Sequence, residues 1–188
     1  MTNFIKSVTV FCGSRMGNNP AYIQAAKDLG KGLVQNKLRL VYGGGNVGLM
    51  GALSNTVLDN NGAIRGIIPE FLQQREALHT RVHDMLVTND MHRRKSHLYA
   101  EGDAFVVLPG GLGTFDETVE IITWRQLQLH NKPIFILNIA QWAEAFDKTL
   151  HTAVQQGFAE ESILKLYEIT PDVSTTLKRI RETLGITP

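Results

Sequence analysis

Short apolar runs alternate with longer amphipathic stretches along this chain. Runs of strand length occupy residues 7–12, 38–42, 64–68, 84–87, 104–108, 133–137 and 167–170. Between them, apolar residues at helical spacing predict helices over residues 19–36, 49–58, 141–156 and 171–184, and two more after Asp90 and after Thr114. This alternation predicts a parallel sheet covered on both faces, in one doubly wound α/β domain over residues 1–188. Residues 70–81 are polar and irregular, and we expect a loop or lid there.

The stretch 109–114, Pro-Gly-Gly-Leu-Gly-Thr, lies where the buried strand at 104–108 turns into a helix. Glycine lets the backbone take positive φ and lets a ligand approach the main chain closely. The free N–H groups of a first helical turn, together with the positive end of the helix dipole, bind anions. The hydroxyl group of Thr114 adds a further donor. The pattern therefore predicts a phosphate site.

Glu117 follows this loop, and we expect it in the first turn of the same helix. The helix dipole stabilises a carboxylate there, so Glu117 is predicted to stay ionised near neutral pH. An ionised carboxylate suits a nucleophile, a base that activates water, or a group that stabilises positive charge. The plainer interpretation is that Asp116 and Glu117 only complement the dipole.

Two further glycine-rich loops, at residues 13–17 and 43–48, also follow predicted strands. In parallel sheets, ligands bind beyond the carboxyl ends of the strands, so all three loops are expected to meet in one crevice. Gly43, Gly45 and Gly48 match the dinucleotide pattern GxGxxG, but they follow the second strand and the acid that the pattern requires is misplaced. A glycine wall close to a mononucleotide is favoured over a site for NAD or FAD.

Four basic residues, 92–95, open the helix after Asp90, where cations meet the unfavourable end of the dipole. Such a broken rule is expected at functional sites, so Arg94 is predicted to reach into the crevice, with Arg93 in solvent and Lys95 in support. The alternative is a solvated charge run with Arg94 in an ion pair. Glu120 could equally assist catalysis or pair with a base. Thr123 could contact substrate or pack.

Composition narrows the class of protein. The chain has 188 residues, of which 43% are hydrophobic and 20% are charged, and a net charge of +1, so we expect neither nucleic acid nor an acidic membrane as a partner. Cys12 is the single cysteine, which excludes an internal disulfide and a cysteine metal cluster. No signal-peptide pattern and no apolar run of membrane length are present, so a cytoplasmic protein is expected. No metal is expected, because the histidines at 79, 83, 92 and 97 lack a helical ligand pair with an added acid. Ser14 lacks the GxSxG context of a serine hydrolase.

Taken together, these stretches closely resemble the Lonely Guy (LOG) family. The matching motifs are Pro109-Gly110-Gly111-x-Gly113-Thr114-x-x-Glu117, Met91-His92-x-Arg94-Lys95, Ile121-Ile122-Thr123-Trp124 and Tyr42-Gly43-Gly44-Gly45-x-x-Gly48-Leu49-Met50-Gly51. The resemblance implies a Rossmann-like homodimer that hydrolyses cytokinin riboside 5′-monophosphates or AMP to free base and ribose 5-phosphate, without a cofactor. Many members carry the older label lysine decarboxylase.

Carried over by motif, Arg94 and Glu117 would be catalytic. The expected contacts to a small nucleotide substrate are Ser14, Gly44, Gly45, Glu76, Lys95, Gly110, Gly111, Leu112, Gly113, Thr114, Phe115, Asp116 and Thr123. Asp116 and Leu112 depart from residues frequent in plant members, and Glu76 follows a less similar stretch. The alternatives are a nucleotide carrier of the same fold that binds without turnover, a dehydrogenase, and a pyridoxal phosphate enzyme that would have to use Lys95.

Overall fold

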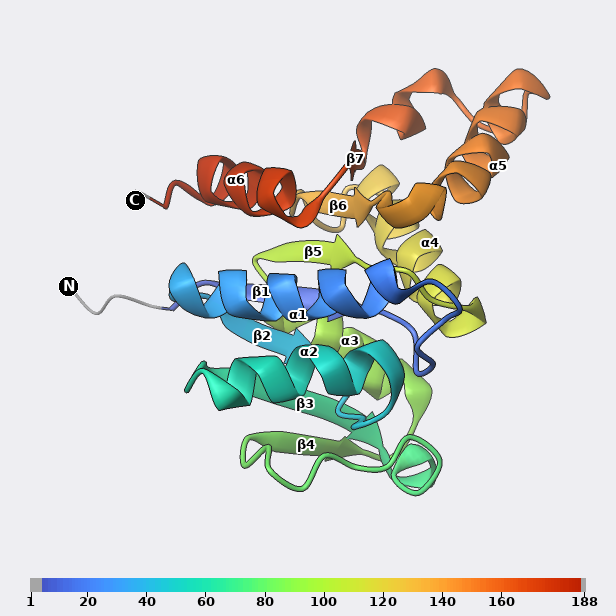
Figure 1. The fold of residues 1–188 in the computed structure, drawn as a ribbon. Coiled ribbons are helices and arrows are strands. Elements are labelled where there is room, and N and C mark those ends of the chain that lie inside the picture. Colours follow the sequence, from blue (N-terminus) through green and yellow to red (C-terminus); the bar gives the residue numbers. More distant parts are fainter. Residues whose placement is uncertain (1–4, 187–188) are drawn as a thin grey trace.

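The computed structural model describes residues 5–186 and contains one sheet of seven parallel strands (Figure 1). The strands are β1 (Ser7–Phe11), β2 (Arg39–Tyr42), β3 (Ile64–Pro69), β4 (Met85–Thr88), β5 (Ala104–Val107), β6 (Ile134–Leu137) and β7 (Glu168–Thr170). Their order is β4-β3-β2-β1-β5-β6-β7. The chain therefore winds outward from β1 in one direction and from β5 in the other, which confirms the doubly wound parallel fold.

Six α-helices cover the two faces of the sheet. They are α1 (Pro20–Gln35), α2 (Gly48–Asp59), α3 (Met91–Glu101), α4 (Leu112–Gln126), α5 (Glu144–Gln155) and α6 (Val173–Leu184). Helices α1, α2 and α6 pack on one face, and α3, α4 and α5 pack on the other (Figure 1). The sheet lies between the two layers of helices, and its strands contribute apolar side chains to both sides. Each face of the sheet therefore has its own hydrophobic core.

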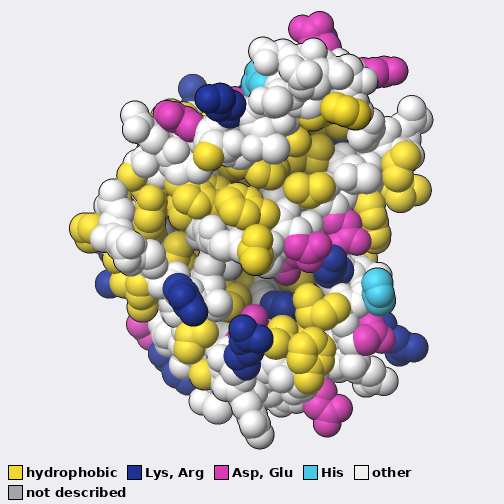
Figure 2. Space-filling view, turned by 90° about the vertical axis from the view of Figure 1, so that its right-hand side faces the viewer, with side chains coloured by type: hydrophobic (Ala, Val, Ile, Leu, Met, Phe, Trp, Pro, Cys, Tyr) yellow, Lys and Arg dark blue, Asp and Glu magenta, His cyan; other side chains and the backbone are white. Residues whose placement is uncertain are grey.

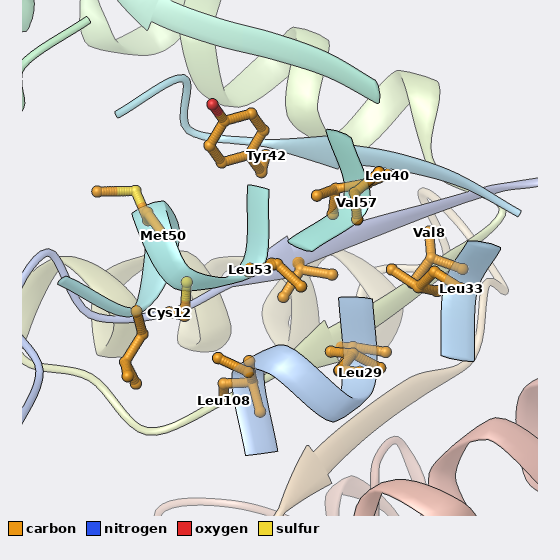
Figure 3. Packing of buried hydrophobic residues seen from close by; sticks show 14 of the residues in the cluster. Val8, Cys12, Leu29, Leu33, Leu40, Tyr42, Met50, Leu53, Val57 and Leu108 are labelled. Carbon is orange, nitrogen blue, oxygen red and sulfur yellow. The ribbon is translucent and has the colours of Figure 1, made fainter. Parts of the chain in front are cut away.

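Residues from α1 and α2 meet alternate strand positions in the first core. Figure 3 shows Leu29, Leu53 and Val57 directed toward the strands that carry Val8 and Leu40, all of them fully buried. Every residue of β1, β5 and β6 is buried, as expected of central strands that read as continuous apolar runs. The rigid sheet thus fixes where the loops at the carboxyl ends begin.

The helix caps that the sequence predicts are present in the structure. Asn19 accepts a hydrogen bond from the amide of Ala21 at the start of α1, and Asp90 accepts one from the amide of Arg93 at the start of α3. Gly157 and Gly185 follow α5 and α6 with φ of 78° and 65°. In residues 5–186, no helix has both the length and the apolar character needed to cross a bilayer.

The start of one predicted helix differs in the structure, whereas the loop predicted at residues 70–81 forms as turns that begin with a short 3-10 helix, Glu70–Leu72. The helix expected over residues 141–156 begins only at Glu144, because Ala140 and Gln141 have positive φ and the Asn138 side chain accepts a hydrogen bond from the Ala143 amide. Residues 70–81, expected as a loop or lid, are tied to the loop after β2. The amide of His79 donates to the Gly44 carbonyl group at 3.1 Å, and the His79 side chain is buried.

Candidate active site

The glycine-rich loops after β1, β2 and β5 touch one another where the strand order reverses. The amide of Gly13 donates to the carbonyl group of Pro109 at 3.0 Å, and the amide of Leu49 donates to the carbonyl group of Gly13 at 3.0 Å. A Cβ atom on Gly48 would lie 2.3 Å from the backbone of Ser14, and φ of Gly48 is +59°. Only glycine fits there, and the predicted convergence on one crevice is confirmed.

A cavity of about 670 Å³ opens at this junction. Figure 2 looks onto the carboxyl ends of the strands, where the surface is hollowed and charged side chains of both signs gather around the hollow. The cavity is lined by β1 and the loop after it, by the loops after β2 and β5, by part of the segment after β3, by side chains from α1 to α4, and by Trp142. The predicted site residues among the lining are Ser14, Glu76, Arg94, Gly110, Gly111, Leu112, Gly113, Thr114 and Glu117.

The first turn of α4 has free amide groups. Gly111 caps the helix without a side-chain hydrogen bond, and the first intrahelical bond runs from the amide of Phe115 to the Gly111 carbonyl group. Within the described part of the chain, the amides of Leu112, Gly113 and Thr114 therefore have no partner. This turn lines the cavity with free donors, as an anion site requires, and the binding of phosphate there stays a prediction.

Two glycines of this turn have no role in packing. An added Cβ atom on Gly111 or Gly113 would meet no atom within 4 Å, and neither residue has positive φ. Gly111 is the N-cap, a position that suits glycine, whereas Gly113 lies inside the helix and costs roughly 1 kcal/mol of stability relative to alanine. The fold gives no reason for that cost, whereas a ligand that approaches the backbone closely does.

Glu117 lies beside this anion site, but its setting differs from the one expected. Helix α4 starts at Leu112, so Glu117 is in the second turn, where the dipole helps a carboxylate less. Burial raises the pKa of the Glu117 carboxyl group to about 7, Arg94 acts in the opposite direction, and Glu76 and Asp116 raise it further. The expectation that the helix dipole keeps Glu117 ionised near neutral pH is therefore not supported, because burial opposes ionisation.

Within residues 5–186, the Glu117 side chain forms neither a hydrogen bond nor an ion pair, although it lines the cavity. A half-buried carboxyl group with a perturbed pKa and no structural partner is typical of a functional residue.

Arg94 reaches the cavity from α3 and is 5% exposed. Its guanidinium group donates to the carbonyl groups of Ile67 and Gly43, both at 3.2 Å, and lies 3.5 Å from the Glu76 carboxylate. A Cβ atom on Gly43 would lie 2.3 Å from the Arg94 Nη2 atom, which explains the glycine at that position. The prediction that Arg94 points into the crevice and Arg93 into solvent is confirmed, because the Arg93 side chain is 71% exposed.

Glu76 completes the charged floor of the cavity. Burial raises the pKa of its carboxyl group, an effect that Arg94 and then Arg75 oppose. The Oε2 atom of Glu76 is buried without a hydrogen-bond partner among the described residues, and its carboxylate is held near Arg94 by charge alone. A polar atom in this state has a free position for a ligand donor.

Lys95 and Asp116 do not line the cavity. The Lys95 ammonium group lies between two carboxylates of α4, 2.8 Å from Asp116 Oδ2 and 2.7 Å from Glu120 Oε2. The Tyr99 hydroxyl group donates to the same Glu120 oxygen at 2.7 Å. Of the two roles left open for Glu120, pairing with a base is the one that the structure shows.

The other predicted contacts also lie outside the cavity wall. Thr123 is exposed on α4 and bonds its own helix through the Val119 carbonyl group. Phe115 packs beneath the loop, and Gly44 and Gly45 contact the segment after β3. The glycines of the second motif thus hold protein segments together, which removes the basis for a dinucleotide pyrophosphate site there.

Several lining residues carry no recognisable signal in the sequence. Trp142 stacks on Phe115 with ring centroids 5.4 Å apart, and Tyr22 and Met16 form an apolar part of the wall. Arg15 and Arg75 also line the cavity. Tyr22 comes from α1, and the others come from loops whose position depends on the tertiary fold. Only Arg15 and Met16, inside the loop at residues 13–17, could have been suspected from the glycine pattern.

Candidate metal ligands do not cluster in this structure. Among the described residues 5–186, no group of three or more His, Cys, Asp or Glu side chains is placed to hold a metal ion.

The strand order, with a free helix N-terminus at its switch point, defines a Rossmann-like α/β protein. The model of a family described as "Possible lysine decarboxylase" matches residues 50–180. A probable cytokinin riboside 5′-monophosphate phosphoribohydrolase of Oryza sativa subsp. japonica is 40% identical, over 95% of this chain and 77% of the relative. A cytokinin riboside 5′-monophosphate phosphoribohydrolase of Rhodococcoides fascians is 41% identical, over 94% of this chain and 89% of the relative. The chain therefore belongs to this family, the LOG family that its motifs resemble.

Solved structures extend the likeness of fold. The molybdenum cofactor carrier protein of Chlamydomonas reinhardtii superposes with a TM-score of 0.75 at 18% identity, over 97% of this chain and 99% of the carrier. At this identity the comparison concerns the fold alone.

Proposed function

We propose that the protein hydrolyses the N-glycosidic bond of nucleoside 5′-monophosphates, such as cytokinin riboside 5′-monophosphates or AMP. The observation that carries the proposal is one juxtaposition. The free amides at the start of α4 and the unpaired carboxyl group of Glu117 face the same cavity, with Arg94 opposite. The names of the relatives support the same reaction.

In this proposal the phosphate group binds the amides of Leu112, Gly113 and Thr114. That remote contact supplies binding energy that orients the ribose over Glu117. Arg15 and Arg75, at the cavity wall, add positive charge where an anionic substrate enters. Arg94 holds Glu76 and fixes the floor beneath the sugar.

The reaction breaks the bond between the anomeric carbon and the base nitrogen, and its electrons leave with the base. Positive charge develops at the anomeric carbon, as in other glycoside cleavages. Water supplies the new oxygen at that carbon, and the base takes up a proton, so the products are free base and ribose 5-phosphate. Whether Glu117 stabilises the charge, activates water or attacks directly, it acts in its ionised form.

The proposal predicts that AMP and isopentenyladenosine monophosphate release free base, which chromatography detects. Adenosine should react at least about 10²-fold more slowly in kcat/KM, because it lacks the group that the α4 amides bind. Equal rates on adenosine and AMP would contradict the phosphate anchor. Binding of AMP without any release of adenine would support the carrier alternative instead.

The lysine decarboxylase description does not fit this cavity. A pyridoxal phosphate enzyme needs a lysine that forms a Schiff base with the cofactor. The cavity wall formed by the described residues contains no lysine, and the nearby Lys95 is engaged by two carboxylates. We therefore derive no step through that cofactor.

We also propose that the protein is a homodimer, as the family resemblance implies, and that α4 contributes to the interface. Apolar side chains are exposed along this helix and the turn after it. They are Leu112, Val119, Leu127 and Leu129, with exposed fractions of 87%, 46%, 63% and 67%. Exposure of several apolar side chains to water is unfavourable, and contact with a second copy of the chain would bury them. A cytoplasmic location remains a prediction from the sequence.

Val119→Glu should shift the protein from dimer to monomer in sedimentation velocity, because it places a charge in the proposed interface. Phe158→Glu is the matched control, since Phe158 is 87% exposed but lies after α5. A wild-type protein that is monomeric at micromolar concentration, or a dimer that survives Val119→Glu, would contradict this interface.

A further inference from the structure

The charged groups behind Glu117 form a cluster that joins α3 to α4. Its members are Lys95 and Tyr99 of α3 and Asp116 and Glu120 of α4. We call it the α3–α4 cluster. It lies outside the cavity wall, so its side chains do not meet a ligand there.

We propose that the α3–α4 cluster positions Glu117 and sets its protonation state, and that Lys95 acts in this way in place of contacting substrate. This proposal rests on the proposed function in one respect, because only that reaction makes the protonation state of Glu117 matter to catalysis. Its structural basis is independent of that function.

The Lys95–Asp116 ion pair joins α3 to α4 directly beside the two cavity residues. Arg94 and Lys95 are consecutive on α3, and Asp116 and Glu117 are consecutive on α4. In each pair one residue reaches the cavity and the other joins the Lys95–Asp116 contact at 2.8 Å. This contact therefore fixes the two helices relative to each other directly beside Arg94 and Glu117. The Lys95 side chain is 16% exposed and that of Asp116 is 54% exposed, so solvent reaches this contact from the Asp116 side only.

The charge of the α3–α4 cluster acts on the Glu117 carboxyl group. The cluster contains one ammonium group and two carboxylates, which leaves a net negative charge next to Glu117. Tyr99 is 4% exposed and its hydroxyl group donates to Glu120, so one carboxylate is held in place. Negative charge nearby makes a carboxyl group harder to ionise, and the Lys95 ammonium group limits this effect.

The groups that face Glu117 come from every neighbouring element. Arg94 and Lys95 on α3 favour its ionised form, whereas Glu76 after β3 and Asp116 on α4 oppose it. Two neutral groups complete the surroundings: the Tyr99 hydroxyl group, and the thiol group of Cys12, whose pKa burial raises far above its usual range. Within this set, Lys95 and Asp116 are the charges that lie outside the cavity wall. They can be changed without removing a side chain that lines it.

The two substitutions should move the titration of Glu117 in opposite directions. Lys95→Met removes the cation and leaves two carboxylates, so the pKa of Glu117 should rise by about one unit. Asp116→Asn removes one of the anions, so the pKa should fall by roughly half a unit or more. A cluster that only stabilised the fold would not give shifts of opposite sign.

The measurement is a carbon-13 NMR titration of the glutamate carboxyl groups in the protein without ligand. Loss of one signal in Glu117→Gln assigns the Glu117 resonance. Lys6→Met is the matched control, because Lys6 also pairs with an aspartate, Asp103 at 3.1 Å, beside the amino ends of β1 and β5 and away from the cavity. It should leave the titration unchanged. Because no turnover is needed, a failure of the proposed reaction would not affect this result.

A second measurement is the pH dependence of kcat/KM for AMP in the same variants. The rising limb should move to higher pH in Lys95→Met and to lower pH in Asp116→Asn, in step with the NMR values. Shifts of the same sign, or no shift in either variant, would overturn the proposal. A raised KM for AMP in Lys95→Met with an unchanged titration would assign Lys95 to substrate binding and overturn it as well.

Discussion

Glu117→Gln should lower kcat for AMP hydrolysis by at least about 10²-fold, the usual scale for loss of one electrostatic stabiliser in an active site. Glutamine keeps the shape of the side chain but has no negative charge to offer the developing positive charge at the anomeric carbon. AMP binding should stay nearly intact, because the phosphate group is held by backbone amides of α4. Rapid-quench assays would give kcat, and calorimetry would give the dissociation constant. Retained turnover would rule out the assigned role.

The same variant should affect stability in a pH-dependent way. The folded-state pKa of Glu117, about 7, lies above its ordinary value of 4.5, so its ionised form is disfavoured by folding. The contribution of this group to stability is fully present below the ordinary value and is lost as the pH rises through about 7. The Tm of Glu117→Gln, relative to wild type, should therefore increase as the pH is raised over that range. A variant that loses activity and gains stability is expected where a residue serves function.

Wild-type kcat/KM should rise with pH through the pKa of Glu117, which is about 7 in the free protein, because all three roles require the ionised carboxylate. A limb that falls over this range would instead indicate that the protonated form acts as a general acid.

Gly110→Ala should be the most damaging change in the glycine-rich loop. A Cβ atom at Gly110 would lie 2.0 Å from Thr114 Oγ1 and 2.9 Å from the Gly13 amide nitrogen. Thr114 is buried, and the Gly13 amide already bonds to Pro109, so neither side can retreat cheaply. We expect a loss of about 3 kcal/mol or more in the free energy of unfolding, at the upper end for overpacking. Urea denaturation followed by circular dichroism would measure it.

Gly113→Ala is the matched control for this prediction. It lies three residues away in the same turn, where an added methyl group meets no atom within 4 Å. Its stability should equal or slightly exceed that of the wild type, since alanine is the better helix former. Its KM for AMP should nevertheless rise about tenfold, because the methyl group would obstruct the approach of the phosphate to the amides. A normal KM in Gly113→Ala would argue against phosphate at this turn.

Much of the architecture could be predicted from the sequence because it depends on local pattern. The apolar runs gave the strands, and glycines placed after them gave the loops that meet at the switch point. Asn19 and Asp90 marked the starts of α1 and α3 by cap chemistry that acts within a few residues. The late start of α5 was missed, since a hydrogen bond from the Ala143 amide to the Asn138 side chain leaves no periodic signal.

The candidate site could be predicted only in outline. Motif and resemblance drew attention to Glu117 and Arg94, and both line the cavity. The pKa of Glu117 could not be anticipated, because burial and the charges of distant residues determine it. Lys95 pairs with Asp116, which is 21 positions further along the chain, and such a contact exists only once α3 and α4 are packed. Trp142 enters the wall for the same reason.

The most direct test of this account is a crystal structure of the Glu117→Gln variant with AMP bound. The account predicts that the phosphate oxygens accept hydrogen bonds from the amides of Leu112, Gly113 and Thr114. It also predicts that the side chain at position 117 lies against the anomeric carbon, between the ribose and Arg94. A phosphate bound away from the start of α4, or a ribose directed into solvent with residue 117 out of reach, would contradict it.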